Sequence, residues 1–587
     1  MPLKILLMFA SPIRDMFRVP DWLRHYQKAN VSQDLLAGLI VGILVVPQSL
    51  GYAVLSGLPA VYGLYSAIVP VLVYAWVGSS SVNAVGPVAI TAIMTAQALQ
   101  DYQGLPPDHY AVMASFLALL TGAMLWLASV FRLGWITQFI SRGVRAGFIS
   151  GAAILILVGQ LKYVTGISIS GSSLPANLEF LWYHLDELHY PTLLLGVMAF
   201  VVLVVNRYYL KHWLGHVLPD KAVLIITKLL PLLVVVLSIM ASVFFEFAEL
   251  GIKTISHVPS GLPSFVLPIY PVSPVELVDL LPSAALMALI AFVSSDSVAS
   301  TMASKRGESY KANHELAGLG LANMVGAFFQ SFAVVGGFSR TAVNSDAGAK
   351  TPLASIVSVA VMVAVLLVLS QLLAPLPYAI LGATIMAAII SMIDIATLKS
   401  AIKFDKLDAI AFITALVGVL MFGLNTGLVM GLFASFAGLI WRSSHPHMAI
   451  VGQVGDTGHF RNVKRHQVSE YDGLLIVRID ESLFYGNVHS VQSFIENELA
   501  NHPQCQHVVL MLSAVNHIDL TAQDMLIKLC QHLKAKNITL HYSEIKGPVM
   551  DIIEQTDVIQ GLTGQVFLST QQAVKTLGRV PHSLHKP

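Results

Sequence analysis

The chain carries fourteen apolar stretches, and this repetition limits what it can fold into more than any other feature. A membrane-spanning α-helix needs about 20 apolar residues, and a soluble domain does not bury so many runs of that length. Only 11% of the 587 residues are charged, whereas 55% are hydrophobic. The sequence therefore predicts a polytopic α-helical membrane protein. The predicted spans lie at 35–55, 59–78, 84–100, 111–131, 135–160, 191–209, 223–246, 277–300, 313–331, 337–347, 352–373, 376–395, 407–424 and 426–442.

The basic residues of the connecting loops support this number of spans. Lys and Arg concentrate in cytoplasmic loops of membrane proteins. With a cytoplasmic N-terminus, the loops after even-numbered spans face the cytoplasm and hold most of the loop Lys and Arg, with Lys162 and Lys253 as exceptions. An even number of spans also returns the C-terminus to the cytoplasm. We expect a multi-pass protein of the cell inner (plasma) membrane, embedded in lipid, with both termini cytoplasmic.

Composition along the chain predicts five parts. They are a basic cytoplasmic segment at 1–33, a membrane domain at 34–442, a linker at 443–470, a cytoplasmic α/β domain at 471–580 and a tail at 581–587. In the α/β domain, the apolar patterns predict strands at 474–479, 508–512 and 538–541, with helices at 488–499, 520–533 and 549–553. The only cysteines, Cys505 and Cys530, lie there, and a cytosolic location argues against a disulfide or a metal site.

The spans form two sets of seven, which indicates an internal duplication. Because seven is odd, the second copy would be inverted in the membrane relative to the first. Val46–Ala53 can be aligned with Phe292–Ala299, and the Gly-Pro stretch at Gly86 has nearly the same offset as the Gly-Phe-Ser-Arg stretch at Gly337. Chance similarity among Gly- and Ala-rich helices is the alternative explanation.

One short stretch, Val335–Asn344, has the composition of an anion site. Its two glycines allow a closely packed extended backbone, and Ser339 can open a short helix. A helix that begins inside the membrane directs free N–H groups and the positive end of its dipole forward, and Arg340 adds a full charge. Gly86 and Pro87 repeat this pattern earlier in the chain. We predict two half-helices that face each other across one anion.

Asp296 is the one acid that we place deep in an apolar span. A charge at the bilayer centre costs about 2.5–3.5 kcal/mol on insertion scales, so we expect Asp296 to bind the coupled H⁺ or to help hold Na⁺. A structural ion pair, or hydrogen bonds to neighbouring serines, is the alternative. Arg340 would either attract the anion or clamp Asp346 or Asp296.

Other polar residues in the spans have less specific interpretations. Gln48 follows a proline inside the first span, where it would line a cavity or bond a neighbouring helix. Tyr52 fits the role of a packing or an interfacial aromatic residue, and Arg142 and Arg145 are expected to reach the cytoplasmic interface. The sequence has no Walker-type loop, metal-ligand spacing, nucleophile motif or nucleic-acid motif. We therefore expect no enzyme activity, cofactor, metal or nucleic-acid partner.

Several segments resemble a known family. Residues 34–70 resemble the first signature of the sulfate permease (SulP) family, solute carrier family 26, and residues 313–330 with 336–354 resemble its second-half signature. Residues 473–488 and 508–525 resemble the STAS domain (sulfate transporter and anti-sigma-factor antagonist) that follows the membrane domain in this family. The resemblance covers nearly the whole chain.

The resemblance implies fourteen membrane segments in a 7+7 inverted repeat like that of uracil permeases. It also implies a core domain that moves against a gate domain in an elevator-like step, and a homodimer. Proton-coupled members usually carry Glu at the span-8 position where we place Asp296. The usual span-1 motif of the family has Ala where Gly51 stands. With the anion between spans 1, 3, 8 and 10, the coupling-ion residue is Asp296 and the substrate-binding residues are Gln48, Tyr52, Gly86, Pro87, Val88, Phe338, Ser339 and Arg340.

In the α/β domain, Asp519-Leu520-Thr521-Ala522 replaces the Asp-Ser-Ser-Gly stretch of STAS domains. Thr521 stands where anti-sigma antagonists carry a phosphorylatable Ser. The resemblance thus marks Thr521 as a regulatory position and implies a cytosolic protein partner, although a helix-cap role for Thr521 is the better interpretation.

The predicted function is secondary active transport of an inorganic anion, with sulfate taken up together with H⁺. Opposed N–H donors, a hydroxyl and one Arg suit an oxyanion that must be released again. The alternatives are Na⁺-coupled bicarbonate transport, H⁺-coupled dicarboxylate transport, an anion channel or exchanger, and a sensor that signals through its STAS domain.

Overall fold

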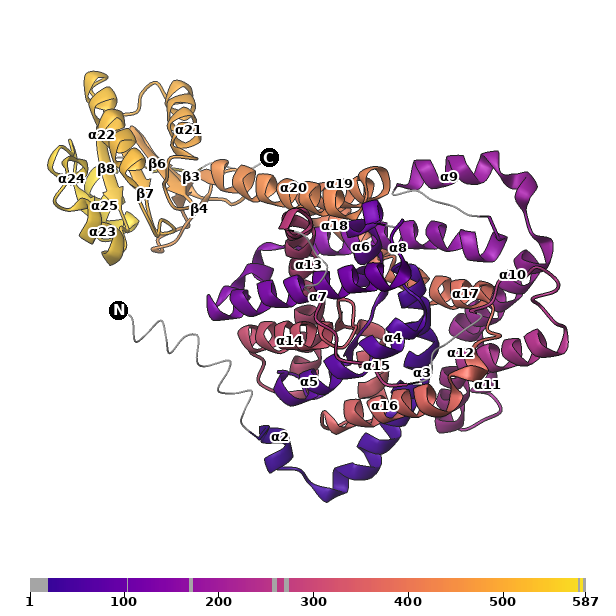
Figure 1. Cartoon of the computed structure of the whole chain (residues 1–587). Helices are drawn as coiled ribbons and strands as arrows, with labels where there is room; N and C mark the ends of the chain where they lie inside the picture. The colour runs from indigo at the N-terminus through magenta and orange to yellow at the C-terminus, as the bar shows by residue number, and fades with distance from the viewer. Residues whose placement is uncertain are drawn as a thin grey trace. The chain divides into compact units, whose positions relative to one another are not determined.

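The computed structural model describes residues 19–102, 104–167, 173–255, 261–268, 274–578 and 581–583. The chain divides into two compact units between Ser435 and Phe436. The first unit is built from helices, and the second contains a β-sheet with helices packed on it (Figure 1). Most of the predicted N-terminal segment (1–18) and the end of the predicted tail (584–587) lie outside the described residues.

Each predicted membrane span contains a helix. The first half comprises α3 (Val31–Leu55), α4 (Val61–Ser66), α5 (Val69–Val77), α6 (Ala89–Ala98), α7 (Pro107–Val130), α8 (Arg142–Thr165), α10 (Tyr190–Val205) and α12 (Asp220–Phe244). The second half comprises α13 (Pro274–Arg306), α14 (Ala312–Ala327), α15 (Phe338–Asp346), α16 (Leu353–Ala364), α17 (Tyr378–Ile389), α19 (Lys406–Phe422) and α20 (Leu424–Ser444). The sequence did not predict the shorter helices α9 (Leu174–Tyr183) and α18 (Ile395–Phe404), nor the four-residue helices α2 (Asp21–Arg24) and α11 (Lys211–Leu214).

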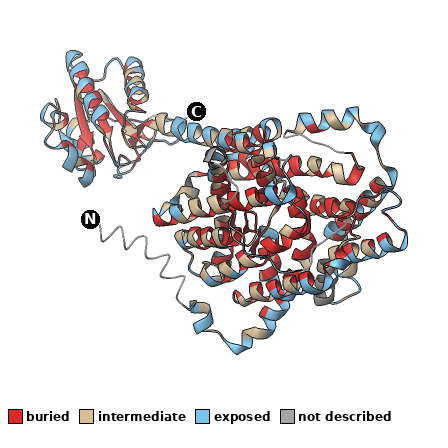
Figure 2. Cartoon of the chain, viewed as in Figure 1, coloured by how far each residue is buried: buried red, intermediate tan, exposed pale blue. Residues whose placement is uncertain are grey.

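Length and composition suit the helical unit to a membrane. Among the described helices, seven are long and apolar enough to cross a bilayer unaided, and several shorter apolar helices accompany them. Buried residues fill the interior of this unit, whereas α9 is largely exposed (Figure 2). Within the unit, α14 packs against α7 and α5, and α8 packs against α19 and α17.

The third and tenth spans contain half-helices instead of complete ones. Each begins with a two-residue strand, β1 (Val85–Gly86) or β2 (Val335–Gly336), and continues as a short helix, α6 or α15. Pro87 has no N–H and restricts its own backbone and that of Gly86, so the chain stays extended until α6 begins. These two interruptions position the candidate site.

The second unit is organised around an eight-stranded sheet with the order β10-β5-β3-β6-β7-β8-β9, in which β4 also pairs with β3. Strands β6, β7, β8 and β9 are parallel, and β3 joins β6 antiparallel. The strands are β3 (Met448–Gln453), β4 (Phe460–Asn462), β5 (Ser469–Tyr471), β6 (Leu474–Ile479), β7 (His507–Met511), β8 (Thr539–Ser543), β9 (Val566–Phe567) and β10 (Pro581–Ser583).

Alternating side chains give this sheet two apolar faces. Val477 and Leu510 belong to a core with α21 (Val488–Asn501), α22 (Leu520–Ala535), α23 (Gly547–Ile553) and α24 (Asp557–Gln560). Ile476 and Val509 belong to a second core with α25 (Thr570–Leu577). The three strands and three helices predicted in this region are present within two residues of their predicted positions.

Two predicted boundaries of this unit are wrong. Residues 443–470 were predicted as a linker, but β3, β4 and β5 lie there and belong to the sheet. The tail that was predicted from residue 581 begins with β10, which pairs with β5. The sequence of these strands does not indicate burial, because they are short and are separated by polar turns. They become buried only by pairing with β6 or with one another.

Candidate functional site

The two half-helix openings meet in the structure. Strands β1 and β2 pair antiparallel, with Val85 opposite Gly336 and Gly86 opposite Val335. The Gly337 amide also donates to the Ala84 carbonyl at 3.1 Å. Because each strand leads directly into its half-helix, the beginnings of α6 and α15 lie together. The predicted proximity of the two stretches is confirmed.

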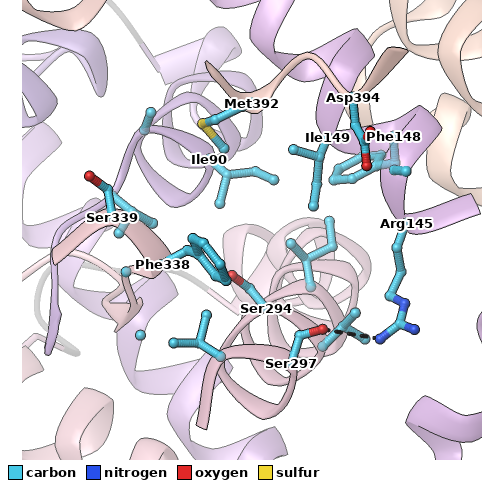
Figure 3. A pocket seen from close by; sticks show the side chains of 18 of the residues that line it. Ile90, Arg145, Phe148, Ile149, Ser294, Ser297, Phe338, Ser339, Met392 and Asp394 are labelled. Atoms are coloured by element: carbon cyan, nitrogen blue, oxygen red, sulfur yellow. Dashed lines mark hydrogen bonds between the residues drawn. The ribbon is translucent and has the colours of Figure 1, made fainter. Parts of the chain in front are cut away.

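A pocket of about 570 Å³, hereafter the central pocket, lies beside this strand pair. It is lined by α3, α6, α8, α13 and α15 and by the segment that precedes α18. Phe338 is 61% exposed toward this open space, whereas Arg340 on the same helix is buried. Figure 3 shows Phe338 beside Ser294 of α13. The predicted residues that line the pocket are Gln48, Tyr52, Val88, Phe338, Ser339 and Arg340.

The other two predicted binding residues, Gly86 and Pro87, are not among the lining residues. Gly86 has φ +152°, a conformation that L side chains rarely adopt, and a Cβ there would lie 2.9 Å from Nη1 of Arg340. A Cβ on Gly337 would lie 2.8 Å from Nε of Arg340. Both glycines therefore make room for the Arg340 guanidinium, and Gly86 acts through that side chain.

Arg340 is buried without an acidic partner. It is 4% exposed, its Nη2 has no hydrogen-bond partner, and it forms no ion pair with Asp346 or Asp296 within the described part of the chain. A buried cation without a counter-charge is costly, because low-dielectric surroundings replace water. The clamp that was predicted as an alternative is therefore absent among these residues. The free N–H groups beside the central pocket suit an anion.

Asp296 is not where the prediction placed it. Ser294, Ser297 and Thr301 of α13 line the central pocket, but Asp296 does not. Its carboxylate accepts a hydrogen bond from the Tyr310 hydroxyl at 2.6 Å. Successive residues of an α-helix are about 100° apart, so Asp296 points away from the side that carries Ser294. The sequence identified the helix, but not which of its faces lines the central pocket.

Sequence reasoning missed Glu315, an acid that is hydrogen-bonded to Asn83 just before β1. It is completely buried, although Asp296 was predicted to be the one deep acid. Its carboxylate accepts hydrogen bonds from Tyr74 at 2.7 Å, Asn83 at 3.0 Å and Ser295 at 2.5 Å, and from Ser79. Glu315 lies in the first turn of α14 after a charged loop, so its position in the sequence indicated the membrane surface.

Asn83 connects Glu315 to the strand pair. The Thr341 hydroxyl of α15 donates to Oδ1 of Asn83 and accepts from the Ala84 amide, both at 3.0 Å. One continuous network thus joins α14, the residues before β1 and the half-helix α15. We infer that Glu315 holds the scaffold of the site and does not contact its cargo.

Two further arginines contribute to the central pocket. Arg142 and Arg145 were predicted to reach the membrane interface, but both line the pocket. Arg142 donates to the Thr397 hydroxyl, and Arg145 donates to the Ser297 hydroxyl, each at 3.2 Å. Among the described residues, the lining contains three arginines and one acid, Asp394. The expectation of a single cation in the pocket is wrong.

In the second unit, Thr521 does not cap a helix. The cap of α22 is Asp519, whose Oδ1 accepts from the Ala522 amide and whose Oδ2 accepts from the Tyr485 amide, both at 2.8 Å. Thr521 is exposed in the first turn of α22. The predicted cap role is thus wrong, whereas phosphorylation of Thr521 stays a prediction.

The fold and the central pocket together define an α-helical membrane protein with a cationic site between two half-helices, followed by an α/β domain. Comparison with known families agrees, because residues 31–415 match the sulfate permease family and residues 465–573 match the STAS domain. The chain belongs to the sulfate permease (SulP) family, solute carrier family 26, and carries a C-terminal STAS domain. The resemblance found in the sequence is confirmed.

Similar proteins span nearly the whole chain. Sulfate transporter 4.1, chloroplastic, from Arabidopsis thaliana is 32% identical over 96% of this chain and 82% of its own length. The probable sulfate transporter MT1781 from Mycobacterium tuberculosis is 29% identical over 95% of this chain and 97% of its own length. The chain is therefore an anion transporter by family, and the family consists of transporters and not of enzymes.

Solved structures show the same fold. The murine solute carrier 26 family member A9 anion transporter in the inward-facing state has a TM-score of 0.84, with 94% of this chain and 93% of that chain covered at 23% identity. The transmembrane domain of the cyanobacterial bicarbonate transporter BicA has a TM-score of 0.58, with 70% of this chain and 98% of that chain covered at 22% identity. The predicted fold class is confirmed: an α-helical membrane core followed by an α/β STAS domain.

Proposed function

We propose that this protein is a secondary active transporter that takes up a small inorganic anion, with sulfate as the leading substrate. The observation that carries the proposal is the buried guanidinium of Arg340 beside the central pocket, whose Nη2 has no partner in the described part of the chain. An oxyanion would satisfy these donors with charge-assisted hydrogen bonds. The names of the plant and bacterial relatives support sulfate as the anion.

The pocket residues divide into polar and apolar groups for this task. Arg340 would supply the charge, and Ser339, Gln48 and Tyr52 would supply hydroxyl and amide donors. The beginnings of α6 and α15 would add the positive ends of their helix dipoles. The apolar side chains of Val88 and Phe338 would exclude water around the anion.

For the driving ion, we propose H⁺, with Na⁺ as the alternative. The acid that we assign to this role is Asp296, which is bonded to Tyr310 and follows the pocket-lining Ser294 on α13. Protonation of Asp296 would neutralise the carboxylate that accepts the hydrogen bond of the Tyr310 hydroxyl. Because Tyr310 lies in the loop between α13 and α14, the weaker hydrogen bond would change how this loop is held. Coupling through Asp296 would thus be indirect.

We also propose an elevator-type alternating-access step. Helix α8 packs mainly against α17 and α19, whereas α13 packs against α7, α14 and β2, and both α8 and α13 line the central pocket. Movement of one group past the other would carry the pocket across the membrane. A homodimer in the inner (plasma) membrane, cytoplasmic termini and a cytosolic partner of the STAS domain complete the proposal.

Uptake by purified protein in proteoliposomes tests the proposed function. Labelled sulfate, bicarbonate, succinate and chloride are supplied with and without an inward pH or Na⁺ gradient. We expect sulfate to accumulate against its gradient only when the interior is alkaline. Accumulation of another anion, or a dependence on Na⁺, would identify one of the alternative transporters. Currents that reverse at the Nernst potential of the anion at every pH would identify a channel.

The variant Asp296→Asn tests the coupling separately. If Asp296 carries the proton, D296N loses accumulation driven by the pH gradient but keeps sulfate exchange at equilibrium, because the central pocket is unchanged. Equal gradient-driven uptake by D296N and the wild type would show that Asp296 serves only as the partner of Tyr310.

A further inference from the structure

Arg145 connects two helices that pack in different parts of the membrane unit. Its Nη1 donates to the Ser297 hydroxyl of α13 at 3.2 Å, and both residues line the central pocket. Figure 3 shows Arg145 extended from α8 to Ser297, with Phe148 and Ile149 on its own helix. Because α8 packs on α17 and α19, and α13 packs on α7 and β2, this hydrogen bond joins the two groups at the pocket.

The acceptor of this hydrogen bond is a neutral hydroxyl. The one acid that the described part of the chain contributes to the pocket lining is Asp394, which caps α18. It accepts from the Thr397 amide at 2.9 Å and from the Thr397 hydroxyl at 2.6 Å. Arg145 is in none of the ion pairs of the described residues. A guanidinium pairs more strongly with an oxyanion than with a neutral hydroxyl, because the oxyanion carries the opposite charge and can accept two parallel N–H groups.

We propose that Arg145 is a second anion-binding group of the central pocket, and that an anion replaces Ser297 as the acceptor of its guanidinium. The anion would be held between α8 and α13 before it reaches Arg340. Its binding would break the hydrogen bond that ties α8 to α13, so anion loading would free the two helix groups to move. This inference rests on the proposed anion transport.

The test measures the KM and the maximal rate of sulfate uptake in proteoliposomes for four variants. Arg145→Ala removes the donor and the charge, Arg145→Gln keeps a neutral donor, Arg145→Lys keeps the charge, and Ser297→Ala removes the acceptor. Loss of a hydrogen bond to a charged group corresponds to roughly a 10-fold change in affinity or more. We expect KM to rise about 10-fold in R145A and R145Q, and by less in R145K.

Ser297→Ala separates anion binding from a structural latch. If Arg145 binds the anion, S297A leaves its charge in the pocket and does not raise KM, whereas R145A does. If the hydrogen bond is only a latch, R145A and S297A have the same effect and R145Q restores KM, and this result would overturn the proposal. An unchanged KM in R145A and R145Q would overturn it as well.

A charge-matched control and a folding check complete the experiment. Lys403→Ala removes an exposed cation of α18 that does not line the pocket, and its KM should match that of the wild type. Elution of each variant as a single species in detergent shows that it is folded. If R145A does not fold, the KM values of R145K and R145Q are compared with that of the wild type instead. If the wild-type protein transports none of the four anions, the proposed function itself is refuted, and this inference falls with it. If the wild type transports sulfate but the KM of R145A and R145Q is unchanged, only this inference is refuted.

Discussion

Two charged side chains are buried near the two ends of β1, and their surroundings are opposites. Glu315 bonds Asn83, which precedes the strand, and receives hydrogen bonds from four side chains. Arg340 packs against Gly86, where the strand ends, and its Nη2 has no partner within the described residues. Both residues are less than a tenth exposed, so burial alone does not distinguish them.

The difference between them is one of satisfied and unsatisfied hydrogen bonds. A buried charge whose partners are all present contributes to the scaffold, and its removal leaves several donors unpaired. A buried charge without partners destabilises the folded protein unless something binds it. We therefore interpret Glu315 as an anchor of the strand pair and Arg340 as a group whose partner is the transported anion.

The largest expected effect is a loss of folded protein in Glu315→Ala. The four donors of Tyr74, Ser79, Asn83 and Ser295 would lose their acceptor, and each unsatisfied buried donor costs about 1–3 kcal/mol. We expect E315A to be largely absent from the monodisperse fraction in detergent, and Glu315→Gln, which keeps one acceptor oxygen, to be less affected. Glu308→Ala, at an exposed position in the loop between α13 and α14, is the control. Equal stability of E315A and E308A would contradict the interpretation of Glu315 as an anchor of the strand pair.

The second expected effect is a loss of transport in Arg340→Ala without a loss of stability. Removal of an unpaired buried charge leaves the thermal unfolding temperature unchanged or raises it, whereas removal of a desolvated charge that holds a ligand costs roughly 2–5 kcal/mol of binding. We expect the KM for sulfate to rise at least about 30-fold. Saturable uptake with the wild-type KM would show that Arg340 does not contact the anion.

The smallest expected effect concerns His541, a buried titratable residue of the STAS domain whose ring is hydrogen-bonded to the Gln565 amide. Its Nδ1 accepts the Gln565 amide at 3.0 Å, which favours the neutral ring. Burial lowers the pKa of His541, and nearby His507 lowers it further, to about 4. In the unfolded chain the pKa is about 6.5, so the unfolded state binds the proton first. The contribution of His541 to stability is therefore complete above about pH 6.5 and is lost as the pH falls toward 4.

Hydrogen exchange of the full-length protein measures this effect. The amides of β8 and β9 should exchange faster at pH 5 than at pH 7, after correction for the intrinsic rates. In His541→Asn, whose side-chain oxygen can accept the Gln565 amide but does not titrate, this difference should disappear. His466→Asn at an exposed position should keep it. Identical pH dependence in H541N and H466N would assign the change to another group.

The sequence determined the membrane spans, the pairing of the half-helices and the cation at α15. Apolar runs of spanning length form helices in a bilayer because every backbone polar group must be bonded within the protein. Gly86 belongs to a Gly-Pro sequence that predicts an extended backbone before a helix, and Arg340 follows the two glycines of the corresponding stretch in the second half. The parallel part of the STAS sheet was predictable for the same reason, because Leu474–Ile479 and Val508–Leu512 are continuous buried runs.

Only the tertiary structure decided which polar side chains share a space. The choice between Ser294 and Asp296 depends on the rotation of α13 about its axis. The surroundings of Glu315 depend on the packing of the preceding helix α13 and of α5, which is 241 residues away at Tyr74. Arg145 reaches Ser297 because α8 and α13 meet at the central pocket. Local patterns specify which segments leave water, but hydrogen bonds between distant segments depend on packing that single residues do not encode.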